Sequence, residues 1–434
     1  MSNRRATLIQ IFKNKNVIAG LVLLAIILYM CALAFTQYSW VFSQWSNSTY
    51  WETYYPIDAP PAWISLFTGK SYAPYMIVNV RGNGSSVCEF TYYYHYDVPP
   101  QDIEFIVQKP PTFAKTVLYV VLPNGTKLPV DYSISSSTSV TLDVESGDYI
   151  LSIFHMSLPS PDVTARLFQI GGKGTYKFIV VVEHSKCLGM QVVVKSSVYG
   201  LLGTDDEGRD LWAGLVWGAP ISLMVGLVAA LVSTVIAVAL GILSGYQGFI
   251  GRLLGKIGRV FMSESLVWFY DVIINFPGLL LLMLIAVRSP PDPPTVALIL
   301  GLLGWGGTAR VVHVIAQQTS ATPFIEAERA IGATDRRIMF KHVLPHVMPY
   351  VLIRTILAVP SAILSEAILA FLGLTNPAWP TWGIMLENAE RSLWNVYWWW
   401  WIPPGIMLSI VCLAFVLIGR GLEEVLNPRL RHLG

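Results

Sequence analysis

The chain contains several long, uninterrupted apolar runs and one segment of short alternating runs. A bilayer core of about 30 Å requires about 20 helical residues to cross it. Six apolar runs reach this length, and we predict six membrane-spanning helices. They cover residues 17–36 and 221–246, a third span that ends at Val287 and contains Asp271, Asn275 and Pro277, and then residues 295–312, 350–372 and 399–418.

The first apolar run could be a signal peptide or an anchor helix, and the second is longer than one membrane crossing. Residues 17–36 follow four basic residues, as a signal peptide would, but the run is too long for a signal core and no small-residue cleavage site follows. We therefore expect an anchor helix. The uncharged run 211–251 exceeds one crossing, and we divide it near Pro220. An interfacial helix over 210–219 would then turn Leu211, Trp212 and Leu215 toward lipid.

Residues 37–201 follow a different pattern, in which short β-branched and aromatic runs alternate with PNG, SGD and GGKG turns. This pattern is typical of an antiparallel sandwich or barrel, and we expect about eight strands. The clearest candidate strands are residues 116–122, 140–144, 149–154, 177–182 and 190–195. The predicted domains are 1–36 (N-terminus and first span), 37–201 (β-rich) and 202–434 (interfacial helix, spans two to six and a charged loop over 316–348).

Charge placement orients these domains. Charged residues form only 13% of the chain, against about 25% in an average soluble protein. Residues 37–210 hold 11 Lys+Arg and 16 Asp+Glu, a balance of −5, which leaves 18 basic and 11 acidic residues, a balance of +7, for the rest. Basic residues on the cytoplasmic side orient membrane proteins. We expect a multi-pass cell-membrane protein with both termini and the charged loop inside and the β-rich domain outside; Arg288 and Arg391 are exceptions.

The β-rich domain carries features of an exterior location. Its N-glycosylation sequons begin at Asn47, Asn83 and Asn124. Cys88 and Cys187 are candidates for a disulfide in an oxidising compartment. The histidines of this domain show no metal-binding spacing, and the chain has no G-x-x-x-x-G-K-[ST] loop. We therefore expect no metal, no bound nucleotide and no enzymatic activity in this chain.

Four sequence blocks carry a family resemblance. They are Leu202-Gly-Thr-Asp with Gly208-Arg-Asp210; Glu326-Ala-Glu-Arg with Gly332-Ala and His342-Val-Leu-Pro345; Ser365-Glu-Ala-Ile-Leu-Ala-Phe-Leu-Gly-Leu374 with Pro380-Thr-Trp-Gly383; and Asn427-Pro-Arg429. In this order they resemble the dipeptide/oligopeptide-type permeases of ABC importers, specifically the subunit with a long loop after its first span. The resemblance covers about half the chain. Glu328, where the motif usually has Ala, and the large β-rich domain depart from it.

The resemblance implies a mainly α-helical polytopic fold of the type I ABC importer permease kind, with the β-rich extracytoplasmic domain inserted between helices 1 and 2. It implies a second homologous permease, two ATP-binding subunits that hold ATP and Mg, and an extracytoplasmic substrate-binding protein as partners. The implied cargo is peptide or oligosaccharide, and some relatives carry nickel complexes. The alternative function is a membrane-anchored extracellular binding or receptor protein without ATPase partners.

The resemblance also gives the charged loop a role, as a helix that docks into an ATP-binding subunit and couples ATP hydrolysis to transport. Within it, charges can set orientation, apolar side chains can fill a socket, Gly332 can allow a close approach or a bend, and Pro345 and Pro349 can end the inner helix. The alternative is a solvated loop without a partner. The candidate coupling residues are Glu326, Ala327, Arg329, Gly332, Asp335, Ile338, His342, Leu344 and Pro345, with Ile331 and Met339 as further apolar contacts.

Polar residues inside the spans are costly, and they usually face a cavity or a partner. Asp271, Asn275, Glu366 and Arg354 are the candidates. They lie either on a translocation pathway or in ion pairs and helix-cap hydrogen bonds within the bundle, and the sequence leaves both readings open. The run 394–401 contains several tryptophans, which favours a membrane interface over a sugar-stacking platform.

Overall fold

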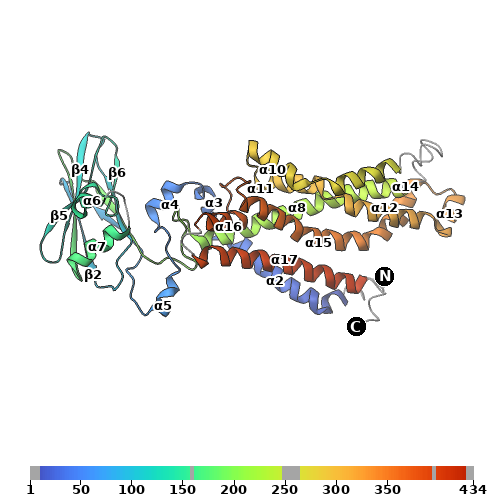
Figure 1. Ribbon diagram of the computed structural model, residues 1–434, viewed down its shortest axis with the longest axis horizontal. Helices are drawn as coiled ribbons and strands as arrows, with labels where there is room; N and C mark the ends of the chain where they lie inside the picture. Colours follow the sequence, from blue (N-terminus) through green and yellow to red (C-terminus); the bar gives the residue numbers. More distant parts are fainter. Residues whose placement is uncertain (1–9, 157–160, 247–263, 393–396, 427–434) are drawn as a thin grey trace. The chain divides into compact units, whose positions relative to one another are not determined.

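The computed structural model describes residues 10–156, 161–246, 264–392 and 397–426. The chain divides into two compact units. A helical unit comprises Met1–Ser46, Ala213–Leu393 and Trp401–Gly434, and a β-rich unit comprises Asn47–Trp212 and Trp394–Trp400. Figure 1 shows the helices and strands of each unit along the chain. The basic cluster at Arg252, Lys256 and Arg259 and the Asn427–Arg429 block lie outside the described residues.

The helical unit consists of long apolar helices and a few short ones. It contains α2 (Lys15–Thr36), α3 (Val41–Gln44), α8 (Leu211–Gly245), a helix over Glu264–Asn275, α10 (Gly278–Arg288), α11 (Pro293–Leu303), α12 (Gly306–Ser320), α13 (Pro323–Ala330), α14 (Asp335–Ile338), the π-helical segment η2 (Met339–Val343), α15 (Leu344–Phe371), α16 (Trp382–Arg391) and α17 (Trp398–Leu426).

Within the described residues, five helices are long and apolar enough to cross a membrane. A sixth span results if Glu264–Asn275 and Leu280–Arg288, which meet at a bend of 65°, are counted as one. Pro277 lies between the two pieces and cannot donate a helical hydrogen bond, which accounts for the break. The predicted fourth span is two helices, α11 and α12, separated at Gly304 and Trp305, and it extends to Ser320.

Glycines bring the long helices close together. Gly20 of α2 lies against Ala414 and Ile418 of α17. Gly383 of α16 lies against Ala367 and Ala370 of α15. In lipid, helix association depends on van der Waals packing and hydrogen bonds, and small residues permit the closest backbone approach. A side chain at either glycine would displace the facing helix.

The predicted break at Pro220 is wrong, because α8 is one helix of 35 residues with Pro220 inside it. The prediction that Leu211 and Leu215 face lipid is also wrong, since these two residues are 3% and 4% exposed. The indole Nε1 of Trp382 donates a 2.9 Å hydrogen bond to the carbonyl of Leu215, and its ring lies against Gly218. Packing one turn before the proline therefore holds the helix together where local propensity alone would end it.

The predicted helix end at Pro345 and Pro349 is likewise wrong. The chain is helical without interruption from Asp335 to Phe371, 37 residues, and both prolines lie inside it. The π-helical turn of Met339–Val343 immediately precedes Pro345. Proline has no amide hydrogen to donate to a helical hydrogen bond. The wider π-helical turn accommodates this missing bond, so the helix continues past Pro345.

The β-rich unit is a sandwich of two four-stranded antiparallel sheets. One sheet has the order β1-β8-β3-β6 and the other β2-β7-β4-β5. The strands are β1 (Met76–Arg81), β2 (Val87–Tyr94), β3 (Asp102–Gln108), β4 (Ala114–Val121), β5 (Lys127–Ser135), β6 (Ser139–Asp143), β7 (Gly174–Val182) and β8 (Gly189–Lys195). Short helices accompany them: α4 (Ser48–Tyr54), η1 (Ala62–Ile64), α5 (Ser65–Thr68), α6 (Asp148–Phe154) and α7 (Pro161–Gly171).

Aromatic side chains from both sheets form one core. Along β2, alternate residues are buried, as expected for a strand with one face in the core. The rings of Phe90 and Phe178 in one sheet contact Phe105 in the other, with centroids 6.5 and 5.2 Å apart. A disulfide joins Cys88 of β2 to Cys187, two residues before β8. It links the two sheets across 99 residues of sequence, where a cross-link stabilises by about 4–5 kcal/mol in the chain-entropy account.

The predicted strand over residues 149–154 is a helix, α6, and that prediction is wrong. Asp148 in its first turn interacts favourably with the helix dipole. The ring of Tyr149 packs on Tyr132 of β5, with centroids 5.1 Å apart, and Ile150 is fully buried. Contacts with the sandwich therefore select a helix for a segment whose composition favours a strand.

The Leu202–Asp210 block forms a compact, polar clasp in the β-rich unit. Arg209 and Asp205 form a buried ion pair, with Nε and Oδ2 2.7 Å apart. Gly203 has a φ of +78° and lies against the carbonyl of Ala59, so a side chain there would be both strained and blocked. The hydroxyl of Thr204 accepts a hydrogen bond from the amide of Ala59. These contacts give Gly203, Thr204, Asp205 and Arg209 of this block specific structural roles.

The three sequon asparagines are all exposed. Asn124 lies in the turn between β4 and β5, where its Oδ1 accepts a hydrogen bond from the amide of Thr126. Asn47 caps α4 by accepting from the amide of Tyr50. Asn83 follows β1. All three side chains are therefore accessible for modification if this unit is exported.

Lys195 is a buried cation on one side of the sandwich. The Nζ of Lys195 is 2.7 Å from Glu104 and 3.4 Å from Asp102, and it donates to the carbonyl of Glu52. Burial would lower the pKa of Lys195, but the two carboxylates outweigh burial and raise it. Burial raises the pKa of Glu104 to about 7 despite the nearby ammonium, and the negative charge of Asp102 and Asp143 adds to the rise. The cluster holds more carboxyl groups than cations.

Replacing this cation tests its importance. Lys195→Met leaves buried carboxylates without a counter-ion, so we expect a loss of about 3–5 kcal/mol in the stability of the β-rich unit. Hydrogen exchange of β3 and β8 amides in the full-length chain would measure it. Lys177→Met, which removes an exposed lysine from β7, is the matched control and should change stability by less than about 0.5 kcal/mol. Equal protection in the two variants would contradict the assignment.

Candidate functional site

The charged loop begins with α13 and turns sharply at Gly332. The amide of Ala333 donates to the carbonyl of Glu328, and the amide of Gly332 donates to that of Arg329. This pair of bonds is the Schellman motif, which requires a left-handed residue after the helix. Gly332 supplies it with a φ of +85°. Thr334 then caps α14 by accepting from the amide of Arg337. Gly332 therefore makes the turn, and no atom lies within 4 Å of where its Cβ would be.

Tyr246 attaches the loop to the end of α8. Its hydroxyl donates a 2.8 Å hydrogen bond to the carboxylate of Asp335, and the guanidinium of Arg329 lies over its ring, 5.3 Å from the centroid. Tyr246 is fully buried, and Asp335 is 6% exposed. Burial and the bond to Asp335 raise the pKa of the Tyr246 hydroxyl. One side chain at the end of α8 thus holds both α13 and α14.

The end of α8 is itself fixed to α12. Gly241 lies against Ala309 and Val312, and Gly245 lies against Ala316, so the two helices are in close contact over a G-x-x-x-G spacing. Between these glycines, the hydroxyl of Ser244 contacts Nδ1 of His313 at 2.9 Å and accepts a hydrogen bond from Tyr270 at 2.8 Å. A polar network therefore joins α8, α12 and the 264–275 helix one turn before Tyr246.

The structure divides the candidate coupling residues into two groups. Ile338 is fully buried with Val343 and Val347 in the chain's own core, and Asp335 is engaged with Tyr246. Both side chains are buried in this chain, and their role in coupling stays a prediction. His342 is half-buried, with its ring against Phe324 and its Nε2 3.6 Å from Glu328. Leu344 is half-buried at the start of α15, and Pro345 is exposed.

The remaining loop residues are exposed, and together with three exposed apolar side chains we call them the loop surface. Ile331, Phe340 and Phe324 are 81%, 69% and 56% exposed, an unusual arrangement for large apolar side chains close together in sequence. Glu326, Ala327, Arg329 and Gly332 are also exposed. In Figure 1 the loop lies at the same end of the helical unit as the start of α2 and the end of α17. Those two ends are joined by hydrogen bonds from Asn14 and Asn16 to Glu424.

Three candidate intramembrane polar residues have partners inside the bundle. Asp271 forms an ion pair with Arg310 of α12. The side-chain Nδ2 of Asn275 donates to the backbone carbonyl of Asp271 in its own helix, at 2.7 Å. Glu366 is 1% exposed and interacts with the hydroxyl of Thr381, the N-cap of α16. None of the three lines the cavity described next, so their surroundings favour a structural role.

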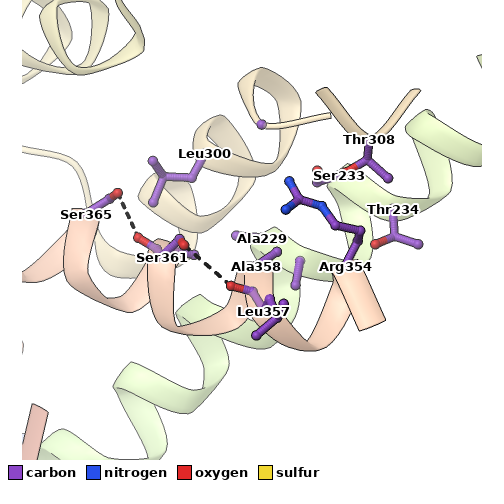
Figure 2. A pocket seen from close by; sticks show the side chains of 13 residues that line it. Ala229, Ser233, Thr234, Leu300, Thr308, Arg354, Leu357, Ala358, Ser361 and Ser365 are labelled. Carbon is purple, nitrogen blue, oxygen red and sulfur yellow. Dashed lines mark hydrogen bonds between the residues drawn. The ribbon is translucent and has the colours of Figure 1, made fainter. Parts of the chain in front are cut away.

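A polar cavity of about 250 Å³ lies between α8, α11, α12 and α15. Figure 2 shows Arg354 of α15 extending into the space between the lining side chains. Hydroxyl groups of Ser233, Thr308, Ser361 and Ser365 also line it. Sequence reasoning found Arg354 and missed these hydroxyls, because serine and threonine are common in apolar helices. Their positions on different helices, all facing one cavity, are set by the tertiary fold.

Comparisons with known proteins concern the helical half of the chain. Residues 237–432 match the family model described as "Binding-protein-dependent transport system inner membrane component". The dipeptide transport system permease protein DppC of Bacillus subtilis (strain 168) is 34% identical over 231 residues, which is 53% of this chain and 69% of the relative. The oligopeptide transport system permease protein OppC of the same organism is 33% identical over 230 residues, 53% of this chain and 72% of the relative.

A search of solved structures finds the MetNI methionine ABC transporter in inward-facing conformations. The matched chain is 17% identical, the TM-score is 0.38, and the match covers 49% of this chain and 95% of that one.

The attachment of the loop through Tyr246 can be tested by one hydroxyl. Tyr246→Phe removes a hydrogen bond to a buried carboxylate, worth roughly 1.5–3 kcal/mol, so amides of residues 326–345 should exchange roughly 10-fold faster or more. Hydrogen exchange with mass spectrometry on the purified chain measures this. Tyr350→Phe is the matched control on α15, and it should leave exchange unchanged. Unaltered protection in Tyr246→Phe would show that the loop is held by other contacts.

Proposed function

The chain belongs to the family of binding-protein-dependent transport permeases that includes the dipeptide and oligopeptide systems, and on this premise we propose that it is the translocating subunit of an ATP-driven importer. It is a multi-pass membrane protein whose family does not itself carry ATPase activity. In the proposal, two separate subunits bind ATP and Mg, a second, homologous permease completes the pathway, and an extracytoplasmic binding protein delivers the cargo.

The observation that carries the proposal is the loop surface together with its attachment. Exposed Ile331, Phe340 and Phe324 beside Glu326 give a surface suited to an apolar socket with charged edges. Asp335 and Arg329 connect this surface to the end of α8 through Tyr246. A displacement of the loop by closing ATP-binding subunits would therefore act on α8 and, through the continuous helix 335–371, on α15.

The proposed transport step follows from these connections. ATP-driven closure moves the loop and converts the pathway from inward-open to outward-open, and the binding protein then releases its cargo into it. The names of the relatives favour peptides, and oligosaccharides are the second cargo class. The orientation that fits the charge distribution has the loop and both termini in the cytoplasm and the β-rich unit outside.

The alternative is a membrane-anchored receptor that works without ATPase partners. It requires no exposed apolar side chains in the charged loop, since a solvated loop would be polar throughout. Co-purification separates the two functions. If ATP-binding subunits co-purify with the chain from its native membrane, the importer function is supported. If the chain co-purifies only with extracellular partners, the receptor function is supported.

The loop should transmit ATP hydrolysis to transport. Gly332→Val strains the left-handed turn and enlarges the loop surface, and Glu326→Arg reverses a charge on it. We expect each to lower the uptake of a labelled tripeptide mixture by about 10-fold or more while ATP hydrolysis continues, since about 1.4 kcal/mol of lost coupling contact already gives a factor of 10.

Two variants control for charge and size. Glu423→Arg reverses an exposed charge at the end of α17, and Gly307→Ala adds a methyl group where nothing lies within 4 Å. Both should retain uptake. Uptake at the unmutated level in Gly332→Val and Glu326→Arg would contradict the coupling role.

The β-rich unit is proposed to be an outer docking surface for the binding protein. Met76 at the start of β1 pairs with Val194 near the end of β8, so the sandwich can be removed between them and replaced by two glycines, because paired strands lie about 5 Å apart. Binding-protein affinity, measured by surface plasmon resonance on the purified transporter, should fall by at least about 10-fold, and the ATP-binding subunits should remain bound. Unchanged affinity would assign the unit another role.

A further inference from the structure

The cavity of the helical unit contains a cation without a counter-ion. Arg354 lies close to the start of the predicted fifth span, residues 350–372. Its side chain is exposed, and it has no hydrogen-bond or ion-pair partner among the described residues. Arg310, which also lies in a membrane helix, is paired with Asp271. A charge at bilayer depth costs several kcal/mol unless it faces water or a partner. Arg354 therefore needs a ligand, a partner or solvent in this cavity.

The groups around Arg354 define the chemistry of that ligand. Ser233 of α8 and Thr308 of α12 are each 9% exposed and line the cavity, and their hydroxyls make no hydrogen bond to other described residues. Each can donate one hydrogen bond. No acidic side chain occurs among the described residues that line the cavity. A guanidinium with two free hydroxyls and no carboxylate is a donor set for an anion, and the planar fork of arginine matches a carboxylate.

The other hydroxyls of the cavity are already committed. Ser365 donates to the carbonyl of Ser361 at 2.8 Å, and Ser361 donates to that of Leu357 at 3.4 Å, as the dashed lines in Figure 2 show. The donors that remain for a ligand are therefore on the side of the cavity formed by α8 and α12, facing Arg354 on α15. This places the anion-binding groups on three helices rather than on one.

The size of the cavity narrows the choice of ligand further. About 250 Å³ is below the usual range for a whole drug-sized ligand, and it fits the end of a chain better than a whole oligopeptide. The peptide cargo of the proposed importer offers one such group, its C-terminal carboxylate, at the end of a flexible chain.

We propose that Arg354, Ser233 and Thr308 form a subsite that binds the C-terminal carboxylate of a peptide during translocation. This rests on the proposed importer function and goes beyond it, because it selects cargo with a free carboxylate and disfavours neutral oligosaccharides. The guanidinium takes the carboxylate by two hydrogen bonds, and the two hydroxyls complete its coordination from the opposite wall.

The test is direct binding to the purified permease and ATPase complex in nanodiscs, without the binding protein. The probes are radiolabelled trialanine and trialanine amide, which differ only in the terminal carboxylate. We expect the unmutated complex to bind the acid at least 10-fold more tightly than the amide, because charge-assisted hydrogen bonds are lost with the carboxylate. Equal affinity for the two probes would overturn the proposal without any mutation.

Variants then assign the selectivity to the cavity. Arg354→Gln should abolish the preference for the acid, Arg354→Lys should retain part of it, and Thr308→Val should reduce it several-fold. Arg288→Gln, which removes an exposed positive charge at the end of α10, should keep the full preference. An unchanged preference in Arg354→Gln would overturn the proposal.

Two further outcomes are distinguishable. If Arg354→Gln and Arg354→Lys both release the second permease from the complex, Arg354 pairs with that subunit and the subsite is wrong. If maltotriose, a neutral oligosaccharide, displaces trialanine as well as unlabelled trialanine does, the site is not selective for carboxylates and the proposal fails. ATP-dependent uptake of trialanine by the unmutated complex tests the importer function separately. The importer function can therefore be supported even when the subsite proposal is contradicted.

Discussion

The hydrogen bond between the Tyr246 hydroxyl and the Asp335 carboxylate joins the charged loop to the long apolar helix α8. Asp335 belongs to the loop and Tyr246 directly follows α8, and both side chains are buried where they meet. A buried, charge-assisted bond is worth more than the same bond in solvent. The loop can therefore move only together with α8 or at the cost of this contact, and α12 follows through the Gly241 and Gly245 packing.

The same physics distributes the polar residues of the helical unit. A polar group in lipid must find a partner or line a cavity. Three groups of polar residues have found partners: Asp271 with Arg310, Ser244 with His313 and Tyr270, and Glu366 with Thr381. One cavity is lined by three polar residues that have no partner among the described residues: Arg354, Ser233 and Thr308. The paired groups hold helices together, and the unpaired groups are those available to a ligand.

The β-rich unit is stabilised differently, by a core between its two sheets. Aromatic rings from both sheets fill the core, a disulfide joins the sheets, and one lysine neutralises part of a buried carboxyl cluster. The Asp205–Arg209 clasp gives the segment just before α8 its own buried ion pair. The unit therefore has the contacts of an independent domain, built mostly from pairings between strands distant in sequence and closed by a disulfide.

Much of this organisation follows from local pattern alone. The length of the apolar runs identifies the long helices, and period-two alternation identifies the strands. The spacing of Glu326, Gly332 and Pro345 identifies the loop and its family. Each of these patterns depends only on residues close in sequence. Four features required the tertiary structure. The packing of Trp382 keeps α8 helical at Pro220, and a π-helical turn lets the 335–371 helix continue past Pro345. Contacts with the sandwich make residues 148–154 helical. Ile338 and Asp335 are buried and so are not part of the loop surface. The cavity around Arg354 belongs with these, since its hydroxyls come from helices distant in sequence. Local propensity differs by about 1 kcal/mol per residue for most residues and by about 3 kcal/mol for proline in a helix, and buried contacts between distant segments are enough to reverse it.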